Sequence, residues 1–505
     1  MHFITVQKMK ELEARNNAAG LGWYAMMDNA GKAAARLISE EWDLRGRRVT
    51  AVCGRGNNGG DGMVSAAALA KTGARVTVAL PFGEPRTDEA KTARAHLRES
   101  PEVEVALGMD AAKEAIAGAE LLLDCIFGTG FKGEPDADAR ALIEAVNAAD
   151  AQVIAYDIPS GVEADTGKYL CCVKSVLTIA FDAYKAAHLV NWSAEYTQRS
   201  AVVSIGTAPE TIQTFDGYIP VIDRAYFREH RPVRSNTGNK GTNGRAVMLV
   251  GSETYRGAAT LSTRGALRAG AGYVELVSTG EVCRQALAAS PELICTVCRT
   301  APDGGIARES DDAVLRALEK ADAVVMGCGL GNSESTARLV HLVLENAAVP
   351  IVLDADALNV LAKTPEALRT AKAPLILTPH AGEFCRLFGG EAADAANNPA
   401  PHAQNIAKEY GLTILLKGPI TVIAGPEGTL ASFLGNSGLA RGGSGDVLAG
   451  FIGAMAARGL SPLEAAACGA YLHGRSADIA AQRRSREAML PGDLPELVGE
   501  VFLEL

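Results

Sequence analysis

The sequence has no long apolar run, few aromatic residues and no excess of positive charge. Aromatic residues make up 5% of the 505 positions, and the apolar stretches are short and broken by glycine. None approaches the roughly 18 residues that a membrane-spanning helix needs. Acidic residues outnumber Lys and Arg by 59 to 49, and the formal net charge of -10 argues against electrostatic binding of nucleic acid. We therefore expect neither a membrane nor a nucleic acid as partner.

Signals for secretion, disulfides and structural metal are also missing. Residues 1–8 lack a basic segment followed by an apolar one, so we expect no signal peptide. The ten cysteines are scattered through apolar segments, and Cys295 and Cys298 form a C-x-x-C pair without a second pair at zinc spacing. We expect reduced core cysteines in a cytoplasmic protein.

Glycine, by contrast, is abundant, with 53 residues. Hydrophobic residues at 48% and charged residues at 21% are ordinary for globular proteins. The length predicts about two to four domains. Many glycines and few aromatic residues suit tight strand-to-helix turns over a core of Val, Ile and Ala. The sequence therefore predicts an α/β fold.

Strands followed by glycine-rich polar segments repeat through the first half. Residues 10–40 predict helix with a break near 20–22, and a strand at 48–53 then runs into a glycine loop at 54–62 and a helix at 63–72. This order is typical of a dinucleotide-binding unit, but the spacing is not G-x-G-x-x-G leading to an acidic residue on the next strand. The layout is Rossmann-like without that fingerprint. Further strands are predicted at 74–80, 121–127, 153–156, 176–181 and 201–205.

Three polar clusters in this half follow predicted strands. They occupy 54–62, 124–134 and 157–161. Open α/β sheets bind their ligands at the carboxyl ends of the strands, where these three clusters fall together. The pattern favours a binding site over three unrelated loops.

The second half repeats the α/β pattern after a basic stretch. Residues 220–244 lack periodicity and are predicted as a solvated linker, with the domain boundary between about 212 and 225. Each later strand again leads into a polar cluster, as one catalytic edge would require. The predicted strands are 246–250, 323–326, 350–353, 375–377 and 413–416, followed by a hairpin of 421–424 with 429–433.

A glycine loop at 436–446 leads into a helix at 447–455. Apolar residues of this helix recur at helical spacing on one face. The loop exposes backbone N–H groups at the positive end of the helix dipole, which is an arrangement that binds anions. Asp446 closes the loop, where its carboxylate would accept a proton from a hydroxyl beside a bound phosphate. The alternative interpretation is an N-cap aspartate after a flexible loop.

These clusters together resemble the two-domain NAD(P)H-hydrate repair enzymes over nearly the whole chain. The first half is similar to the NAD(P)H-hydrate epimerase, and Arg55 stands where that family usually has proline. The motifs that carry this similarity are Asn57-Asn58-Gly59-Gly60-Asp61-Gly62, Asp124 with Gly128-Thr129-Gly130-Phe131-Lys132-Gly133, and Asp157-Ile158-Pro159-Ser160-Gly161.

The second half is similar to the nucleotide-dependent NAD(P)H-hydrate dehydratase, whose fold is ribokinase-like. Ala381 and Arg441 replace the usual proline and threonine, but they flank the motifs without removing polar groups. The resemblance implies an epimerase domain at 1–215 and a dehydratase domain at 225–505. The motifs are Lys240-Gly241, Asp354-Ala355-Asp356-Ala357-Leu358, Thr378-Pro379-His380, Lys417-Gly418 and Gly442-Gly443-Ser444-Gly445-Asp446.

The resemblance implies a damaged cofactor as the small-molecule substrate: NADH or NADPH that has gained water at nicotinamide C6, in two epimers. It implies an isomerase that interconverts the epimers and a lyase that returns the S epimer to NAD(P)H while ADP becomes AMP and phosphate. The implied cofactors are ADP or ATP, K⁺ and Mg²⁺, and a homo-oligomer is expected. The choices of ADP against ATP and of NADH hydrate against NADPH hydrate stay open.

In the dehydratase domain, Asp446 is the implied catalytic base, and it would deprotonate the C6 hydroxyl for attack on the terminal phosphoryl group. Asp354 and Asp356 are predicted as structural caps. For Lys417 the alternative is a surface lysine, and for His380 a satisfied turn histidine. The hydrate is expected to face Ala258, Gly331, His380 and Asp446. The nucleotide is expected to contact Lys417, Gly418, Pro419, Ile420, Thr421, Asn436, Gly438, Gly442, Gly443, Ser444 and Gly445.

In the epimerase domain, the resemblance assigns K⁺ to Asn58, Asp124 and Ser160, whose oxygens are suitable hard ligands. Asp157 is the candidate acid/base for epimerisation, with Lys132 nearby, and its alternative role is an N-cap. The dinucleotide is expected to contact Asn57, Asn58, Gly59, Gly60, Asp61, Gly128, Thr129, Gly130, Phe131, Lys132, Gly133 and Glu134.

Two other functions are compatible with parts of the sequence. A ribokinase-like vitamin or sugar kinase, fused to a nucleotide-binding scaffold domain, would use the same loop at 442–446 but leave phosphate on its product. A non-enzymatic scaffold is the second alternative, since epimerase-like domains also occur in RNA-decay scaffolds. The acidic charge and the presence of Asn58, Asp124 and Asp157 argue against the scaffold.

Overall fold

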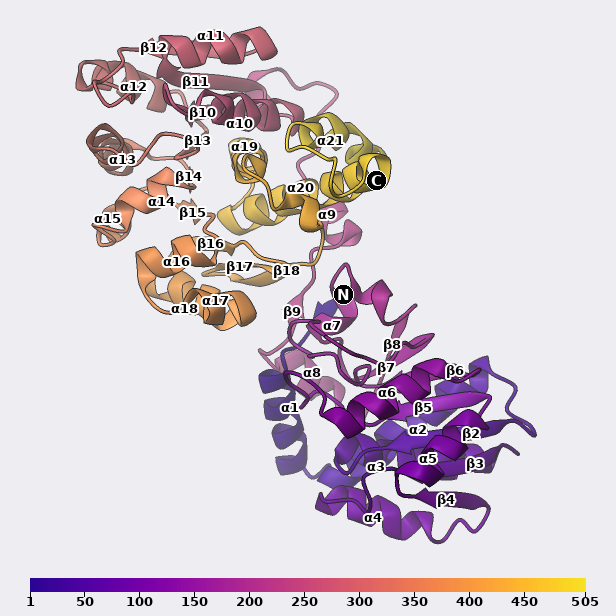
Figure 1. Ribbon diagram of the computed structural model, residues 1–505. Helices are drawn as coiled ribbons and strands as arrows, with labels where there is room; N and C mark the ends of the chain where they lie inside the picture. The colour runs from indigo at the N-terminus through magenta and orange to yellow at the C-terminus, as the bar shows by residue number, and fades with distance from the viewer. The chain divides into compact units, whose positions relative to one another are not determined.

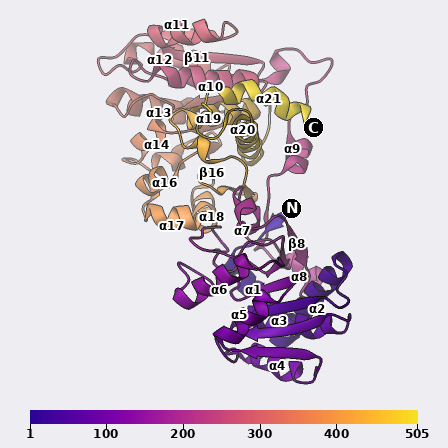
Figure 2. The same cartoon turned by 45° about the vertical axis from the view of Figure 1, so that its right-hand side comes forward.

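The computed structural model describes residues 1–505, which divide into two compact α/β units (Figures 1 and 2). The first unit spans residues 2–219, and the second spans residues 220–505 together with Met1. Each unit has its own sheet and its own hydrophobic core. No helix in either unit combines the length and the apolar character that crossing a membrane requires.

The first unit is built on a seven-stranded parallel sheet with the order β4-β3-β2-β5-β6-β7-β8. Its strands are β2 (Arg48–Cys53), β3 (Arg75–Leu80), β4 (Val103–Leu107), β5 (Leu121–Cys125), β6 (Gln152–Tyr156), β7 (Leu177–Phe181) and β8 (Ser200–Val203). Its longer helices are α1 (Val6–Ala18), α2 (Trp23–Glu41), α3 (Asn57–Ala70), α4 (Asp88–Leu97), α5 (Met109–Ala117) and α6 (Ala137–Ala148). Shorter elements are β1 (His2–Phe3), α7 (Ala186–Leu189), η1 (Ser193–Glu195), α8 (Pro209–Thr214) and β9 (Ile219–Pro220).

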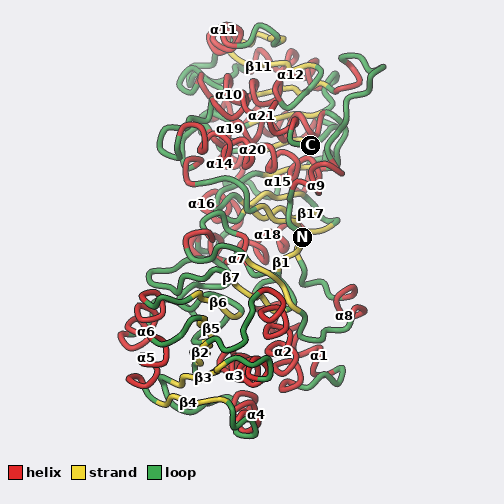
Figure 3. Tube along the Cα trace, turned by 90° about the vertical axis from the view of Figure 1, so that its right-hand side faces the viewer, coloured by secondary structure: helices red, strands yellow, loops and turns green.

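Helices cover both faces of this sheet, which explains its apolar strands. Figure 3 shows α5 and α6 on one side of the strands and α1 and α2 on the other. Successive residues of a strand point to opposite faces. Accordingly, Leu121 and Leu123 of β5 join the core beneath α1–α4, while Leu122 joins the core beneath α5 and α6.

The second unit is built on a nine-stranded sheet with the order β12-β11-β10-β13-β14-β15-β16-β17-β18, in which β17 runs antiparallel to both of its neighbours and all other pairings are parallel. Its strands are β10 (Arg245–Leu249), β11 (Tyr273–Thr279), β12 (Ile294–Cys298), β13 (Ala323–Met326), β14 (Ile351–Leu353), β15 (Leu375–Leu377), β16 (Thr413–Leu416), β17 (Thr421–Gly425) and β18 (Gly428–Ser432). Its helices are α9 (Arg224–His230), α10 (Arg256–Arg268), α11 (Gly280–Ala289), α12 (Asp311–Leu318), α13 (Glu334–Asn346), α14 (Asp356–Leu361), α15 (Ala367–Thr370), α16 (Ala381–Phe388), α17 (Ala392–Asn397), α18 (Pro399–Tyr410), α19 (Ser444–Ala457), α20 (Pro462–Arg484) and α21 (Asp493–Leu503), with short 3₁₀ turns η2 (Gly241–Asn243), η3 (Arg308–Ser310) and η4 (Ser437–Leu439).

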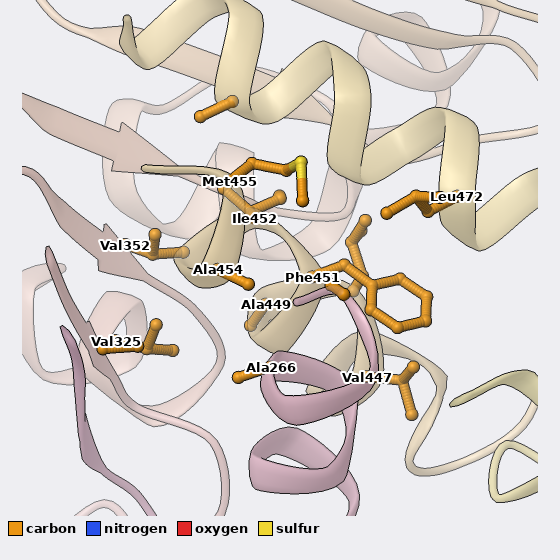
Figure 4. Close-up of a cluster of buried hydrophobic side chains, with 14 of the residues drawn as sticks. Ala266, Val325, Val352, Val447, Ala449, Phe451, Ile452, Ala454, Met455 and Leu472 are labelled. Carbon is orange, nitrogen blue, oxygen red and sulfur yellow. The ribbon is translucent and has the colours of Figure 1, made fainter. Parts of the chain in front are cut away.

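Helix α19 lies at the centre of the second core. The sequence predicted an apolar stripe on one face, but the helix is buried on every side. Figure 4 shows why: Val325 and Val352 of the sheet, Ala266 of α10 and Leu472 of α20 all surround it. A helix that is apolar all round is one that its neighbours enclose. The loop that precedes α19 is therefore attached to the most buried helix of the unit.

Two local predictions are wrong. The glycine-rich segment 57–62 is not a loop, because α3 begins at Asn57 and includes it. A β-carbon on Gly59 would lie 2.1 Å from the carbonyl oxygen of Gly54, so glycine lets the helix start directly against the end of β2. The segment 220–244 is not simply a solvated linker either. It contains α9, whose Phe227 is fully buried and stacks on Tyr471 at 4.5 Å between ring centroids.

Candidate active sites

The sheet of the first unit reverses its strand order at β2, and the predicted polar clusters of that unit lie at the carboxyl ends of its strands. In the first unit, β3 and β4 lie on one side of β2, and β5 lies on the other. A cavity of about 1190 Å³ opens at the carboxyl ends of these strands. Its lining combines residues 54–58 after β2, residues 126–132 after β5, Asp157 after β6 and one face of α1.

Three oxygen-bearing side chains gather under this cavity. Asp124 is fully buried; its Oδ1 accepts from the Ser160 hydroxyl at 2.6 Å and its Oδ2 from the Ser160 N–H at 2.8 Å. Asn58 donates from Nδ2 to the carbonyl oxygens of Phe127 and Tyr156 at 2.8 and 3.2 Å, but its buried Oδ1 accepts no hydrogen bond. Burial raises the pKa of Asp124 to about 6. A buried oxygen without a donor, beside a carboxylate and a hydroxyl, fits a hard cation such as K⁺.

Asp157 occupies a strained turn immediately after β6. Its φ of 61° lies in the left-handed region that few non-glycine residues adopt. Its Oδ2 accepts from the Thr129 N–H at 3.2 Å, and its Oδ1 lies 3.1 Å from the Lys185 Nζ. No helix starts at Asp157, so the alternative role as an N-cap is wrong. Strain held by an ion pair and a backbone contact is a feature of functional sites.

Lys185 is a site residue that the sequence interpretation missed. It was Lys132 that was expected near Asp157, but Lys132 is exposed at the cavity wall, whereas the side chain of Lys185 is only 1% exposed. Lys185 also donates to the Phe181 carbonyl at 2.9 Å. Its position just after β7, at the same sheet edge, was the available signal.

His188 holds this turn from behind as a neutral side chain. Its Nε2 donates to the Asp157 carbonyl at 2.7 Å, and its Nδ1 accepts from the Lys185 N–H at 2.9 Å. Burial, followed by the charge of Lys185, lowers the pKa of His188 to about 4. One side chain therefore fixes the backbone of both members of the ion pair.

In the second unit, Asp446 lies in the first turn of α19. Gly443 is the N-cap of this helix with φ 101°, a left-handed conformation that glycine adopts without strain. The alternative interpretation of Asp446 as the N-cap is therefore wrong. The N–H groups of Gly445 and Asp446 are those that the helix start leaves free for an anion, whereas the Ser444 N–H donates to the Arg441 carbonyl at 3.3 Å. Burial, followed by the charge of Asp354, raises the pKa of Asp446 to about 6.

A buried charge network stands beside Asp446. Asp354 Oδ1 accepts from Lys417 Nζ at 2.9 Å and from the Thr378 hydroxyl at 2.8 Å, and Lys417 Nζ also lies 3.8 Å from Glu383. Although burial lowers the pKa of Lys417, Asp354 and Glu383 raise it above its ordinary value. Lys417 is thus not a surface lysine.

Cys328 joins the two aspartates. Its sulfur and one carboxylate oxygen each from Asp354 and Asp446 lie within 4.8 Å of one another. Burial raises the pKa of the Cys328 thiol well above its ordinary value, so the thiol is a hydrogen-bond donor, and it donates to Asp354 Oδ2 at 3.7 Å. Neither Asp354 nor Asp356 is a helix cap, and that prediction is wrong, since Ala355 is the N-cap of α14.

His380 caps a helix. It is the N-cap of α16, where its Nδ1 accepts from the N–H groups of Gly382 and Glu383 at 3.0 and 3.2 Å. The alternative interpretation of His380, a turn histidine whose hydrogen bonds are satisfied, therefore holds for its Nδ1. The side chain is 56% exposed, and its Nε2 lies 3.6 Å from Glu383, which ties His380 to the Lys417 network.

The other predicted contacts are arranged around this network or farther along the same loops. Gly331 donates its N–H to Asp356 at 2.7 Å, and a β-carbon on the nearby Gly329 would lie 2.6 Å from the Ala258 side chain, so this loop rests on α10. Asn436 accepts from the Gly438 N–H at 3.0 Å and caps η4, whereas Gly438 itself is buried. Residues 418–420 lie in the turn between β16 and β17, Thr421 begins β17, and no hydrogen bond joins these four residues to Asp446.

Comparisons with known proteins match both units. A family model described as NAD(P)H-hydrate dehydratase matches residues 246–498, and one described as YjeF-related protein N-terminus matches residues 24–187. The Bifunctional NAD(P)H-hydrate repair enzyme Nnr of Moorella thermoacetica is 36% identical over 100% of this chain and 97% of its own length. The Escherichia coli enzyme of the same name is 34% identical over 94% of this chain and 88% of its own length.

Among solved structures, an ADP/ATP-dependent NAD(P)H-hydrate dehydratase from Bacillus subtilis is 31% identical with a TM-score of 0.49, covering 57% of this chain and 98% of that one. The predicted fold class, a Rossmann-like unit followed by a ribokinase-like unit, is confirmed. Both halves and their order agree with full-length relatives. This chain belongs to the family of bifunctional NAD(P)H-hydrate repair enzymes.

Proposed function

We propose that the first unit epimerises the C6 hydrate of NADH or NADPH in the cavity beside Asp157, and that the second unit dehydrates the S epimer at the start of α19 with ADP as phosphoryl donor. The observation that carries the second assignment is Asp446, a carboxylate with raised proton affinity beside free helix N–H groups. The proposed base and the anion site then lie within one helical turn.

The dehydration needs the nucleotide because hydroxide is a poor leaving group and phosphate is a good one. Asp446 accepts the proton of the C6 hydroxyl, whose oxygen attacks the terminal phosphorus while the bond to the AMP oxygen breaks. The N–H groups at the start of α19 stabilise the charge on the transferred phosphoryl group. The C6–O bond then breaks with loss of phosphate, C5 gives up a proton to water, and the new C5=C6 double bond restores the dihydropyridine ring.

The network beside Asp446 supports nucleotide binding. Lys417 is already paired with Asp354, so it is a half-buried positive charge that is held in place before phosphate arrives. Mg²⁺ binds through one or two carboxylates together with substrate phosphates, and Asp354 and Asp446 would supply such carboxylates. The Cys328 thiol is a poor ligand for Mg²⁺.

In the first unit we propose Asp157 as an acid/base group, with K⁺ held by Asn58, Asp124 and Ser160. The unpaired Asn58 Oδ1 supports this cation. A bound K⁺ would offset the buried charge of Asp124 and fix the turn after β5 that lines the cavity. Epimerisation measured in K⁺ buffer and in a buffer with only tetramethylammonium tests this site; equal rates would contradict it.

The assay that tests the proposed function uses hydrated NADH with ADP and with ATP in parallel. The unaltered chain is expected to restore the ultraviolet absorbance of NADH and to release AMP and phosphate from ADP. Asp446→Asn is expected to abolish this recovery, and Asp312→Asn, an exposed first-turn aspartate of α12, is the matched control. A product that keeps the phosphate would indicate a kinase instead.

A further inference from the structure

Helix α1 presents one face to the first cavity. Val6, Met9, Lys10 and Glu13 line the cavity, and their spacing of three, four and seven residues puts them on one side of the helix. Glu11 lies on a different side, where it pairs with Lys8 at 2.8 Å. Glu13 is therefore the one carboxyl that α1 directs to the cavity, although no motif in the sequence included it.

Glu13 has no partner within the protein. No hydrogen bond or ion pair reaches its carboxyl, although it is partly buried. The charged groups that act on it are Asp157 after β6, Lys185 after β7, Asp182 and Lys10. Burial, followed by the charge of Asp157, raises the pKa of Glu13 to about 7. A substantial fraction of Glu13 is therefore protonated near neutral pH.

Asp61 supplies a third carboxyl at this site. Asp61 of α3 lines the same cavity, is only 9% exposed and accepts no hydrogen bond. Burial, followed by the charges of Asp157 and Glu13, raises the pKa of Asp61 well above its ordinary value. Three carboxyls thus share a site with one fully buried cation, Lys185, which already lies 3.1 Å from Asp157. An excess of buried carboxyls over cations retains protons.

We propose that Glu13 and Asp157 form the acid/base pair of the epimerase, Glu13 protonating the departing C6 oxygen and Asp157 activating the incoming water. The pair lines one cavity from two different elements, α1 and the turn after β6. Lys185 pairs with Asp157, which suits the role of base, whereas Glu13 forms no ion pair and takes the role of acid. This inference rests on the proposed epimerase function of the first unit.

The chemistry balances without another reactant. C6 of the hydrate bears both the hydroxyl and the ring nitrogen N1. Glu13 donates its proton to the hydroxyl oxygen, the C6–O bond breaks with its electrons on the departing water, and the N1 lone pair forms an N1=C6 iminium. Water then attacks C6 from the other face, Asp157 takes its proton, and the π electrons return to N1. The product has inverted C6, and Glu13 and Asp157 have exchanged protonation states for the reverse reaction.

The first test compares Glu13→Gln with Glu11→Gln in the full chain. We expect Glu13→Gln to slow epimerisation by about 10²-fold or more, as the loss of a general acid does, while Glu11→Gln keeps the rate of the unaltered chain. Glu13→Gln should also remove the decline of the rate that the unaltered chain shows above about pH 7. Epimerisation by Glu13→Gln at the unaltered rate would overturn the inference while leaving the epimerase function intact. An unaltered chain that does not epimerise would instead refute the proposed function.

A second test needs no variant and therefore does not depend on folding. In water enriched in oxygen-18, each inversion by this route replaces the C6 oxygen with a solvent oxygen, after correction for the reaction without enzyme. We expect one label for each inversion, measured by mass spectrometry of the separated epimers. Inversion with the original oxygen retained would mean that the C6–N1 bond opens instead, and it would overturn the assignment.

Discussion

The aspartate that we propose as acid or base in each unit lies at the carboxyl edge of its sheet, but the charges around Asp157 differ from those around Asp446. In the first unit, the Lys185 ammonium lies 3.1 Å from Asp157. In the second, Lys417 pairs with Asp354 at 2.9 Å, and Asp446 stands beside that pair. Asp157 thus has its own cation, while Asp446 has a neighbouring anion, which contributes to the rise of its pKa to about 6. A base that must take a proton from an alcohol gains from the second arrangement.

The strongest way to separate the two sites is to remove Asp446. Asp446→Asn is expected to lower dehydration by about 10²- to 10⁴-fold, since the amide cannot accept the hydroxyl proton. Epimerisation should not change, because no residue of the second unit lines the first cavity. Product analysis of both reactions in the same sample checks the prediction, and a parallel loss of both activities would contradict it.

Removing the cation from Asp157 is expected to affect stability as well as activity. Lys185→Met leaves a largely buried carboxylate without its partner, which typically costs about 3–5 kcal/mol. Lys132→Met, at the exposed wall of the same cavity, is the matched control and should change stability by less than about 0.5 kcal/mol. Thermal and urea unfolding of the first unit measure both. Equal unfolding curves for the two variants would show that the ion pair is dispensable.

A change of pH should affect the two activities in opposite directions. Asp446 must be deprotonated, so dehydration is expected to fall about tenfold per pH unit as the pH drops below about 6. Glu13 must be protonated, so epimerisation should fall as the pH rises above about 7. Initial rates of both reactions across one pH series provide the measurement. If both rates fell at the same end of the pH series, one of these two assignments would be ruled out.

The smallest expected effect comes from Cys328. Its thiol, which donates to Asp354, also lies beside the Asp446 carboxyl, and this neighbour lowers the pKa of Asp446. Cys328→Ala should therefore move the acid limb of dehydration to higher pH, by less than about one unit, since a single weak hydrogen bond is lost. Cys385→Ala, a half-buried cysteine of α16, is the control and should leave the limb in place. A downward shift would contradict the proposed contact.

The sequence predicted the two sheets and the clusters at their carboxyl ends because these features are local. Strand periodicity and the glycines after each strand suffice to place Asp124, Asp157, Lys417 and Asp446 on one edge of their sheets. The helical start at Asn57 was missed because six polar and glycine residues in succession favour a loop unless tertiary contacts decide otherwise. Strands β4, β11 and β12 were not predicted either.

The sequence could not predict which acid each lysine pairs with, and the reason is different. Lys417 and Asp354 are 63 residues apart, and Lys185 and Asp157 are 28 apart, so only the folded backbone decides which acid each lysine meets. Glu13 had no signal at all: it is an ordinary charged residue on an amphipathic helix until α1 is placed against the cavity. Motifs identify residues that chemistry needs at fixed spacing, whereas partners from remote elements need coordinates.

Joining two units with separate cores in one chain fixes the relative amounts of the two catalysts in the cell. Residues 2–219 and 220–505 are each complete as an α/β structure, and yet they are translated together. One messenger therefore yields both catalysts in a fixed ratio of one to one. Whenever the cell makes the catalyst that consumes one epimer, it also makes the catalyst that converts the other.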